Sequence, residues 1–470
     1  IMKMKKNELS FESSSFRDNF GNVFEHQGRI LRSVKEVASE NYKFLKKENI
    51  YEKSISSGFL IKFEELNKTE LPYAFRQFEF VLESKIIPFI SYPYEWSFNQ
   101  LKEASLHHLN FQIYLLNLDV VLRDSSAYNI QFKQGRPIFI DILSLKKYEE
   151  GEYWNGYAQF CENFLNPLLL GSLKGVRHND WFKGSLEGIP TRELVKILNL
   201  KDKLSIKVLI HIVGQAKLQN QNIKNPKDTE KKLKNIKKFP KSSYLFLLKQ
   251  IKNWIEKLKF KKSKTIWENY KNEHTYDDSE FEEKKIIVSE FVEKLKPKKL
   301  IDLGCNTGIF CEIALNKGAE NVVGLDFDEN TIDEAFKKSF EKKLNFLPLV
   351  SDLSNPSPNQ GWMQKERKGL IERFSSDAVI ALALEHHLII GKNVPIVQFI
   401  RWIKNIAKFG LLEFVPKSDE TVSRMLISRK DIYEDYNETY FEKKLSEHTK
   451  ILKKYKISKS GRVIFEYETL

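Results

Sequence analysis

The 470-residue chain has little of several features that would restrict its function at once. Its three cysteines, Cys161, Cys305 and Cys311, form no CxxC pair, which argues against a disulfide framework and a thiolate zinc site. No stretch approaches the roughly 20 uninterrupted apolar residues of a membrane span. The lysine-containing N-terminus has no apolar segment behind it, unlike a secretory signal. We therefore expect a cytoplasmic protein with reduced, structural thiols.

Positive charge is in excess, but it is concentrated in one place. The formal net charge is +14, and residues 216–272 alone contain 17 Lys and four acidic residues, a net charge of +13. Lysine makes point contacts and lacks the bidentate fork of arginine. The charge therefore marks a connecting segment, and it divides the chain into a first domain (1–215), a basic connector (216–272) and a second domain (273–470).

The end of the connector predicts a basic amphipathic helix. Leu247, Ile251, Trp254, Ile255 and Leu258 recur at helical spacing with lysines between them. Such a helix either packs between the domains with a solvated lysine face, or docks on an acidic membrane surface or a polyanion such as nucleic acid. We favour the packed arrangement and keep the peripheral contact as the alternative.

The second domain alternates short apolar strands with helical patterns, as in a parallel sheet covered by helices. Two final strands, near residues 451–458 and 461–468, follow without a long crossover, so we expect them to pair antiparallel. The capping-box spacing of Ser279 and Glu282 predicts a helix before the first strand. The expected earlier strands are residues 298–304, 321–326, 345–350, 377–384 and 410–415.

A glycine-rich turn follows the first of these strands. In the sequence LIDLGCNTG, Gly304 and Gly308 flank Cys305 and Asn306, and a strand-to-helix turn of this kind presents backbone N–H groups to a ligand. Asp326 ends the next strand, where a carboxylate accepts hydrogen bonds from ribose hydroxyls. The turn alone would also suit NAD, but three residues separate the two glycines, which is not the GxGxxG pattern.

Together with three later stretches, the turn resembles the motifs of class I S-adenosylmethionine-dependent methyltransferases. DLGCNTG resembles their first motif, VVGLD the second, VSDL the third and DAVIALALEHHL the fourth. The resemblance implies an α/β fold with a Rossmann-like, seven-stranded, mostly parallel sheet and S-adenosyl-L-methionine as cofactor. It implies Asp302, Gly304, Asn306 and Gly308 for the methionine portion with Cys305 in the same turn, Asp326 for the ribose, Asp352 and Leu353 beside the adenine, and Tyr276 and Lys284 in a segment folded over the cofactor.

Two histidines lie at the predicted end of the fourth strand. Methyl transfer from a sulfonium depends mainly on positioning, and it needs a base only when the nucleophile holds its proton tightly. His386 or His387 would then deprotonate an acceptor hydroxyl, or one of them fills a pocket wall without acid–base work. A third interpretation gathers Glu385, both histidines and Glu413 around a divalent ion, as in some RNA-methylating relatives.

The first domain carries an Asp–Asn–Asp pattern. Asp124 follows a predicted helix, Asn129 comes five residues later, and Asp141 ends a predicted hairpin. The five-residue spacing between Asp124 and Asn129 equals that between Asp and Asn in the HRDxxxxN catalytic loop of protein kinases, so the pattern resembles an α+β kinase-like domain. In it Asp124 would accept the substrate proton, Asn129 and Asp141 would hold magnesium, and Arg32 or Lys35 would reach the ATP phosphates. Only one glycine supports a nucleotide-gripping loop, so a scaffold that only binds substrate or partner is the alternative.

Over nearly the full chain, stretches such as FISYPYEWSF, LRDSSAYNIQF and LALEHHLIIGKNVP resemble the NoeA-type host-nodulation family of bacteria. The resemblance implies a methyltransferase associated with extracellular glycan or secondary-metabolite pathways. Our first hypothesis is O-methylation of a glycan or small polar metabolite that the kinase-like domain recognises. The second adds phosphoryl transfer by that domain, and the third is an RNA- or protein-modifying enzyme anchored by the basic connector. The sequence does not indicate the oligomeric state.

Overall fold

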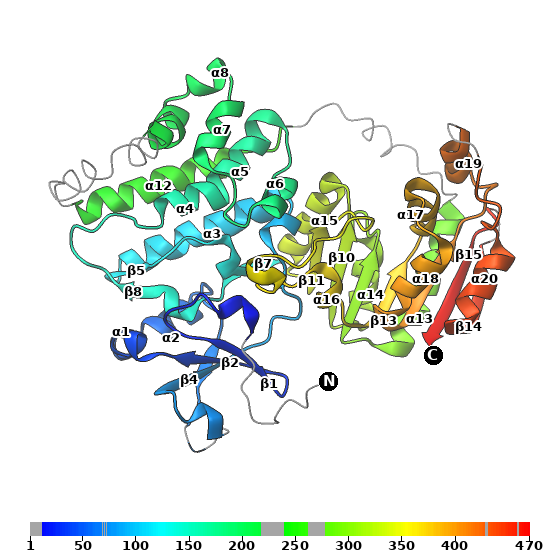
Figure 1. Ribbon diagram of the computed structural model, residues 1–470, viewed down its shortest axis with the longest axis horizontal. Coiled ribbons are helices and arrows are strands. Elements are labelled where there is room, and N and C mark those ends of the chain that lie inside the picture. The colour runs from blue at the N-terminus through cyan, green and yellow to red at the C-terminus, as the bar shows by residue number, and fades with distance from the viewer. Residues whose placement is uncertain are drawn as a thin grey trace.

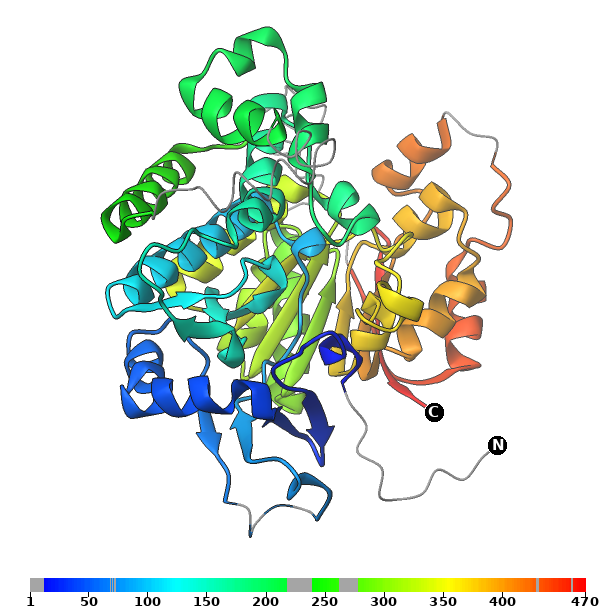
Figure 2. The same cartoon turned by 60° about the vertical axis from the view of Figure 1, so that its left-hand side comes forward.

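The computed structural model of the chain describes residues 12–67, 69, 71, 73–217, 239–261, 278–427, 431–457 and 460–470. Two parts lie side by side, the first with the blue and cyan sheet and the green helices, the second around a long central sheet (Figures 1 and 2). Within the described residues, no helix has the length and apolar character needed to cross a membrane.

The first part begins with a four-stranded antiparallel sheet in the order β1-β2-β4-β3. Apolar side chains of its strands pack against the two helices that follow β2, and Tyr42 and Leu45 on the first of these helices are buried. The elements are η1 (Ser13–Ser15), β1 (Val23–His26), β2 (Arg29–Val34), α1 (Glu36–Lys47), α2 (Ile50–Ser56), β3 (Phe63–Glu65), η3 (Tyr73–Phe75) and β4 (Phe80–Ser84).

A long central helix, α3 (Phe98–Leu116), follows the turn η4 (Pro93–Glu95). Its start is fixed by a capping box, since Ser97 Oγ accepts from Gln100 N and Gln100 Oε1 accepts from Ser97 N. Two small antiparallel pairs, β5 with β8 and β6 with β7, lie after it. Their elements are β5 (Val120–Leu122), η5 (Ala127–Asn129), β6 (Ile130–Lys133), β7 (Arg136–Phe139), η6 (Ile142–Ser144) and β8 (Leu145–Lys147).

Short helices complete the first part. They include three π-helical turns, η7, η8 and η9. The elements are α4 (Tyr157–Phe160), η7 (Cys161–Leu165), α5 (Asn166–Leu169), η8 (Leu170–Lys174), α6 (Asn179–Gly184), α7 (Thr191–Ile197), α8 (Leu200–Lys203), α9 (Ile206–Val208) and η9 (Leu209–Gly214).

The amphipathic helix predicted in the connector is present as α12 (Lys241–Lys257), and it packs against α3. Its apolar face, including Leu248 and Ile251, is buried, and Gln112 Nε2 on α3 donates to Tyr244 Oη at 2.9 Å. Because this face is covered by α3, the helix cannot insert it into a membrane. Residues 218–238 and 262–277 of the connector region lie outside the described part of the chain.

The second part contains a seven-stranded mixed sheet in the order β11-β10-β9-β12-β13-β15-β14. The first five strands in this order run parallel, and β15 pairs antiparallel with both β13 and β14, as expected for the final strand pair. The strands are β9 (Lys299–Leu303), β10 (Asn321–Asp326), β11 (Phe346–Val350), β12 (Ser376–Ala381), β13 (Ala407–Phe414), β14 (Thr449–Lys456) and β15 (Val463–Thr469).

Helices lie on both faces of this sheet (Figure 2). The helix predicted from the capping-box spacing is present as α13, and it leads into β9. The helices are α13 (Asp278–Leu295), α14 (Ile309–Asn316), α15 (Glu329–Lys342), η11 (Trp362–Gln364), α16 (Leu370–Arg373), α17 (Glu385–Lys392), α18 (Ile396–Lys404), α19 (Glu420–Ile427) and α20 (Glu438–Ser446).

Carboxylates on α15 join the two parts at the N-terminus of α3. Glu329 Oε1 accepts from Phe98 N at 3.0 Å, and Asp333 Oδ1 accepts from Asn99 N at 3.1 Å and from Ser97 Oγ at 2.9 Å. The orphan N–H groups and the positive end of a helix favour such negative partners. A buried ion pair between Glu95 and Arg373 lies at the same junction, and one hydrophobic core runs through both parts.

Candidate cofactor site

The turn after β9 has a backbone that requires glycine. Gly304 and Gly308 have φ values of +79° and +76°, which side chains other than glycine rarely adopt. A Cβ on Gly308 would lie 2.5 Å from the Phe346 ring, so the turn packs closely on β11, whereas a Cβ on Gly304 would meet only Leu384 at 3.6 Å. The structure thus leaves room over Gly304 at the carboxyl end of β9, where doubly wound sheets bind ligands.

Asp326 lies beside this turn at the end of β10. Its Oδ2 accepts from Asn306 N at 2.9 Å, and its Oδ1 accepts from Asp328 N at 3.0 Å. Desolvation raises the pKa of Asp326, while the bonds from Asp328 N and Asn306 N oppose that rise. Each carboxylate oxygen has a further lone pair. The side chain is therefore fixed in orientation and retains capacity to accept from two neighbouring hydroxyls.

Asp302 is buried under the same turn. Its Oδ2 accepts from Cys311 Sγ at 3.1 Å, and burial raises the pKa of Asp302 to about 7. Cys305 is buried as well, and burial raises its pKa to about 11. These thiols stay protonated at neutral pH, as expected for structural cysteines. Asp302 does not face solvent here, so it lies beneath the turn and not on the surface that a ligand would meet.

The remaining predicted cofactor residues differ in their exposure and in their partners. Asp352, just after β11, is exposed; although partial burial acts to raise it, bonds from Ser354 hold the pKa of Asp352 below its usual value. Leu353 is half-buried beside it. Lys284 is buried on α13 and pairs with Glu413 at 2.6 Å. Tyr276 lies outside the described residues.

The two histidines differ in their surroundings. His386 is 1% exposed, and its Nδ1 lies 3.5 Å from Glu385 Oε2. His387 is exposed at the surface, and its ring centroid lies 4.2 Å from that of His386. Loss of hydration around the ring, with a smaller effect of His386, lowers the pKa of His387. Of the two histidines, only His387 is exposed.

The divalent-ion interpretation of Glu385, His386, His387 and Glu413 is wrong. Among the residues that the structure describes, no group of three or more His, Cys, Asp or Glu side chains is arranged to hold a metal ion. The physical reason is that both carboxylates have other partners. Glu413 pairs with Lys284 and accepts from Ala383 N at 2.8 Å, and Glu385 accepts from Val415 N at 2.7 Å.

Sequence patterns gave no sign of the partners that complete this buried network. Tyr436 Oη donates to Glu385 Oε1 at 2.9 Å, and Arg462 pairs with Asp419 at 2.7 Å and with Glu413 at 3.5 Å. Buried charges need such partners. Because these residues lie 30 or more positions from the histidines along the chain, only the folded sheet brings them together.

A second cluster forms in the first part from the predicted Asp–Asn–Asp pattern. Asn129 Nδ2 donates to Asp124 at 3.1 and 3.2 Å, and Ser144 Oγ donates to Asp124 Oδ1 at 2.7 Å. Burial and the charge of Asp141 raise the pKa of Asp124 to about 6. The three predicted residues therefore come together, with Asn129 bonded to the Asp124 carboxylate and Asp141 near enough for its charge to act on it.

Arg32 on β2 closes this cluster from the other side. Its Nη1 lies 2.6 Å from Asp141 Oδ1, and its Nη2 lies 2.9 Å from Asp18 Oδ2. Burial acts to lower the pKa of Arg32, but the charges of Asp141 and Asp18 outweigh it and raise the pKa above its usual value. Lys35, the other predicted phosphate ligand, donates to Asp18 O at 2.7 Å. Arg32 is thus the cation that faces the predicted Asp–Asn–Asp residues.

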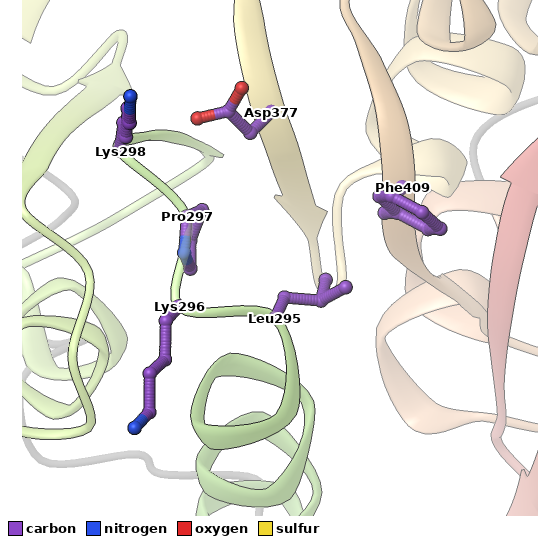
Figure 3. Close-up of a pocket in the computed structure, with 6 residues that line it drawn as sticks. All are labelled: Leu295, Lys296, Pro297, Lys298, Asp377 and Phe409. Carbon is purple, nitrogen blue, oxygen red and sulfur yellow. The ribbon is translucent and has the colours of Figure 1, made fainter.

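A shallow groove lies at the opposite end of the sheet. In Figure 3 Lys298 and Asp377 face each other near the amino ends of β9 and β12. Ligands of doubly wound sheets bind at the carboxyl ends of the strands, so this groove is not the cofactor site. Its lining residues are Leu295, Lys296, Pro297, Lys298, Asp377 and Phe409.

The sheet, its glycine turn and the acid on the next strand define a doubly wound α/β protein with a candidate nucleotide-cofactor site. No family model matches the chain. It is, however, 42% identical over 457 residues to the nodulation protein NoeA of Rhizobium meliloti (strain 1021), over 97% of this chain and 95% of that protein. The chain therefore belongs to the NoeA family of nodulation proteins.

Other similarities are shorter or weaker. A segment covering 11% of this chain is 41% identical to 24% of an uncharacterized protein of Haemophilus influenzae. The N-methyltransferase NodS of Bradyrhizobium japonicum WM9 aligns at a TM-score of 0.30 and 12% identity, over 41% of this chain and 98% of its own. A putative O-methyltransferase of Nostoc punctiforme aligns at a TM-score of 0.30 and 12% identity, over 40% of this chain and 56% of its own. These TM-scores are too low to assign a fold.

Proposed function

We propose that this chain is an S-adenosylmethionine-dependent methyltransferase that O-methylates a hydroxyl of a glycan or small polar metabolite. One observation carries the proposal: the Gly304–Gly308 turn and the Asp326 carboxylate meet at the carboxyl ends of adjacent parallel strands. Membership in the NoeA family supports an acceptor from a nodulation-related pathway, because the relative is named a nodulation protein.

The residues present suit this cofactor. The turn lets a ligand approach the backbone at Gly304, Asp326 has capacity for both ribose hydroxyls, and the Asp326 carboxylate lies beside the turn. A cationic sulfonium is favoured by such charge. When bound, S-adenosylmethionine would supply an electrophilic methyl group on that sulfonium. Asp352 and Leu353 after β11 would then flank the adenine.

We propose His387 as the base for the acceptor hydroxyl and His386 as its support. His387 is exposed, and because its pKa is lowered it is neutral at pH 7. A neutral ring has a nitrogen that can accept a proton, although the lowered pKa makes it a weaker base than an ordinary histidine. His386 is buried against Glu385, and its ring contacts that of His387 at an angle of 37°. Replacing His387 with Gln should therefore lower kcat and remove an acid-limb pKa from the rate profile, with little change in cofactor affinity.

Labelled cofactor tests the proposal directly. The protein would be incubated with S-adenosylmethionine carrying a labelled methyl group and with fractionated bacterial extract. Label should appear in a glycan or polar-metabolite fraction and should be alkali-stable, as an ether is. Label confined to RNA or protein would refute the acceptor class, and the absence of transfer to every fraction would refute the methyltransferase itself.

The cluster in the first part supports a second candidate function, phosphoryl transfer to the same acceptor. Asp124, Asn129 and Asp141 lie together, opposite the Arg32 guanidinium, in the roles that a kinase-like resemblance implies. The raised pKa of Asp124 suits a proton acceptor. Arg32, however, is already paired with Asp18 and Asp141, so phosphates would have to compete with two carboxylates for it.

Nucleotide binding separates the two functions. ATP with magnesium should raise the melting temperature if the first part is a kinase, and replacing Asp141 with Asn should abolish that rise. A shift with S-adenosylhomocysteine but none with ATP and magnesium would leave the methyltransferase function and refute the kinase. In that case the first part serves acceptor recognition.

A further inference from the structure

The region α7–η9 exposes an unusual amount of aliphatic side chain. Within 14 residues, six Leu and Ile side chains are at least 40% exposed, with Leu200 at 83% and Leu204 at 81%. Scattered apolar residues are normal on a surface, but contiguous apolar patches mark an interaction site. The six, which we call the aliphatic patch, are Ile197, Leu200, Leu204, Ile206, Leu209 and Ile210.

Positive charge accompanies the aliphatic patch. Residues 192–217 contain six basic and two acidic residues. Both acids are paired with lysines, Glu193 with Lys196 from the same stretch and Asp202 with Lys174 from outside it. Lys201 and Lys207 are exposed between the aliphatic residues.

The patch lies at an outer end of the molecule. In Figure 1, α8 lies at the edge of the first part, far from the α17 region where the histidines lie. The segment is therefore separate from the candidate cofactor site. The segment packs on α12, where Lys207 Nζ lies 5.8 Å from the Trp254 ring centroid and the His211 ring lies 5.8 Å from the same ring. The apolar face of α12 is itself buried against α3, so the exposed aliphatic side chains belong to α7–η9.

We propose that the aliphatic patch and its lysines dock this protein on the surface of an anionic lipid bilayer. Aliphatic side chains inserted at the headgroup boundary and lysines attracted to anionic lipids are the two components of interfacial binding. A nucleic acid would neutralise the lysines but would leave the aliphatic side chains in water. A neutral protein groove would cover the aliphatic side chains but would not match the charge.

Vesicle co-sedimentation of the full chain tests this inference. Phosphatidylcholine vesicles containing phosphatidylserine should bind the protein, while pure phosphatidylcholine should bind it much more weakly. Binding should weaken as salt concentration rises, because the lysine component is screened. Replacing Leu204 and Ile206 together with Ser should lower the partition coefficient at least about ten-fold, and replacing Lys201 and Lys203 with Gln should lower it by about ten-fold.

A matched control separates the patch from exposed aliphatic surface in general. Ile427 at the end of α19 is 83% exposed on the far side of the molecule (Figure 1), so Ile427→Ser should leave vesicle binding unchanged. Circular dichroism should show that the Leu204→Ser and Ile206→Ser variant is folded, since both side chains are exposed.

Three results would overturn the inference. The first is no binding to anionic vesicles. The second is binding that the Lys variant reduces but the Leu204 and Ile206 variant does not, which shows electrostatic attraction alone. The third is a dimer in sedimentation that the same Ser variant dissociates, with no vesicle binding, which makes a second copy the partner. None of these depends on methyltransferase activity.

Discussion

The joint between α15 and α3 can be broken with one substitution, Asp333→Ala. Asp333 accepts three hydrogen bonds from the start of α3, from Ser97 Oγ, Asn99 N and Asn99 Nδ2, at 2.9, 3.1 and 2.6 Å. Its side chain is only 18% exposed, so water cannot easily replace it. We expect the variant to loosen the contact between the two parts as well as the helix start.

The size of the effect follows from these contacts. Loss of an N-terminal helix cap costs about 0.5–2 kcal/mol, and each hydrogen bond to a charged group contributes about 1.5–3 kcal/mol. The contributions are not additive, since the Ser97 and Glu329 caps remain. A loss of about 2–4 kcal/mol in the free energy of unfolding is expected.

Calorimetry and urea unfolding of the full chain measure this loss in the free energy of unfolding. The parent should unfold in one main transition, because one core spans both parts, and Asp333→Ala should lower and broaden that transition. Lys337→Ala is the control, because its ion pair with Asp333 at 3.2 Å is 55% exposed on the lysine side, so a change below about 0.5 kcal/mol is expected. If Asp333→Ala were as stable as the unsubstituted protein, Asp333 would not stabilise the contact between α15 and α3.

Two further predictions concern Gly308 in the turn after β9 and Glu329 at the contact between α15 and α3. Gly308→Ala should cost about 1–3 kcal/mol, because its Cβ would lie 2.5 Å from the Phe346 ring at a φ of +76°; Gly184→Ala, with nothing within 4 Å, should be tolerated, and equal thermal shifts would contradict this. Burial raises the pKa of Glu329, which accepts from Phe98 N, to about 7, so its contribution to stability is lost as pH rises through that value. Glu329→Gln should therefore gain stability relative to the parent from about pH 5 to pH 8 in urea titrations, and a constant difference would show that Glu329 does not titrate there.

Local patterns predicted the elements of the second part well. The expected strands 298–304, 321–326 and 345–350 appear as β9, β10 and β11 with shifts of at most one residue at either end. Apolar runs bounded by glycine and charged residues specify such buried strands without long-range information. The glycine turn was likewise recognisable, because positive φ at two fixed positions demands glycine.

What the sequence did not reveal depends on contacts between distant residues. Nothing near Asp333 indicates that it caps a helix starting 235 positions earlier, at Phe98. The difference between His386 and His387 was also hidden, because adjacent residues on a helix face different directions and only the packed structure shows which side is covered. The metal interpretation failed for the same reason, since Lys284 reaches Glu413 from α13.

The central claim is that the turn after β9 and the acid at the end of β10 hold a sulfur nucleoside. Isothermal titration of S-adenosylhomocysteine into the parent, Asp326→Ala and Glu320→Ala tests it most directly. Glu320 is an exposed acid at the opposite end of the same strand. We expect the unsubstituted protein and Glu320→Ala to bind S-adenosylhomocysteine. Asp326→Ala should bind it about 10- to 100-fold more weakly, because charged hydrogen bonds to the ribose are lost. Unchanged affinity in Asp326→Ala, or a parent that binds NAD and not S-adenosylhomocysteine, would contradict the account.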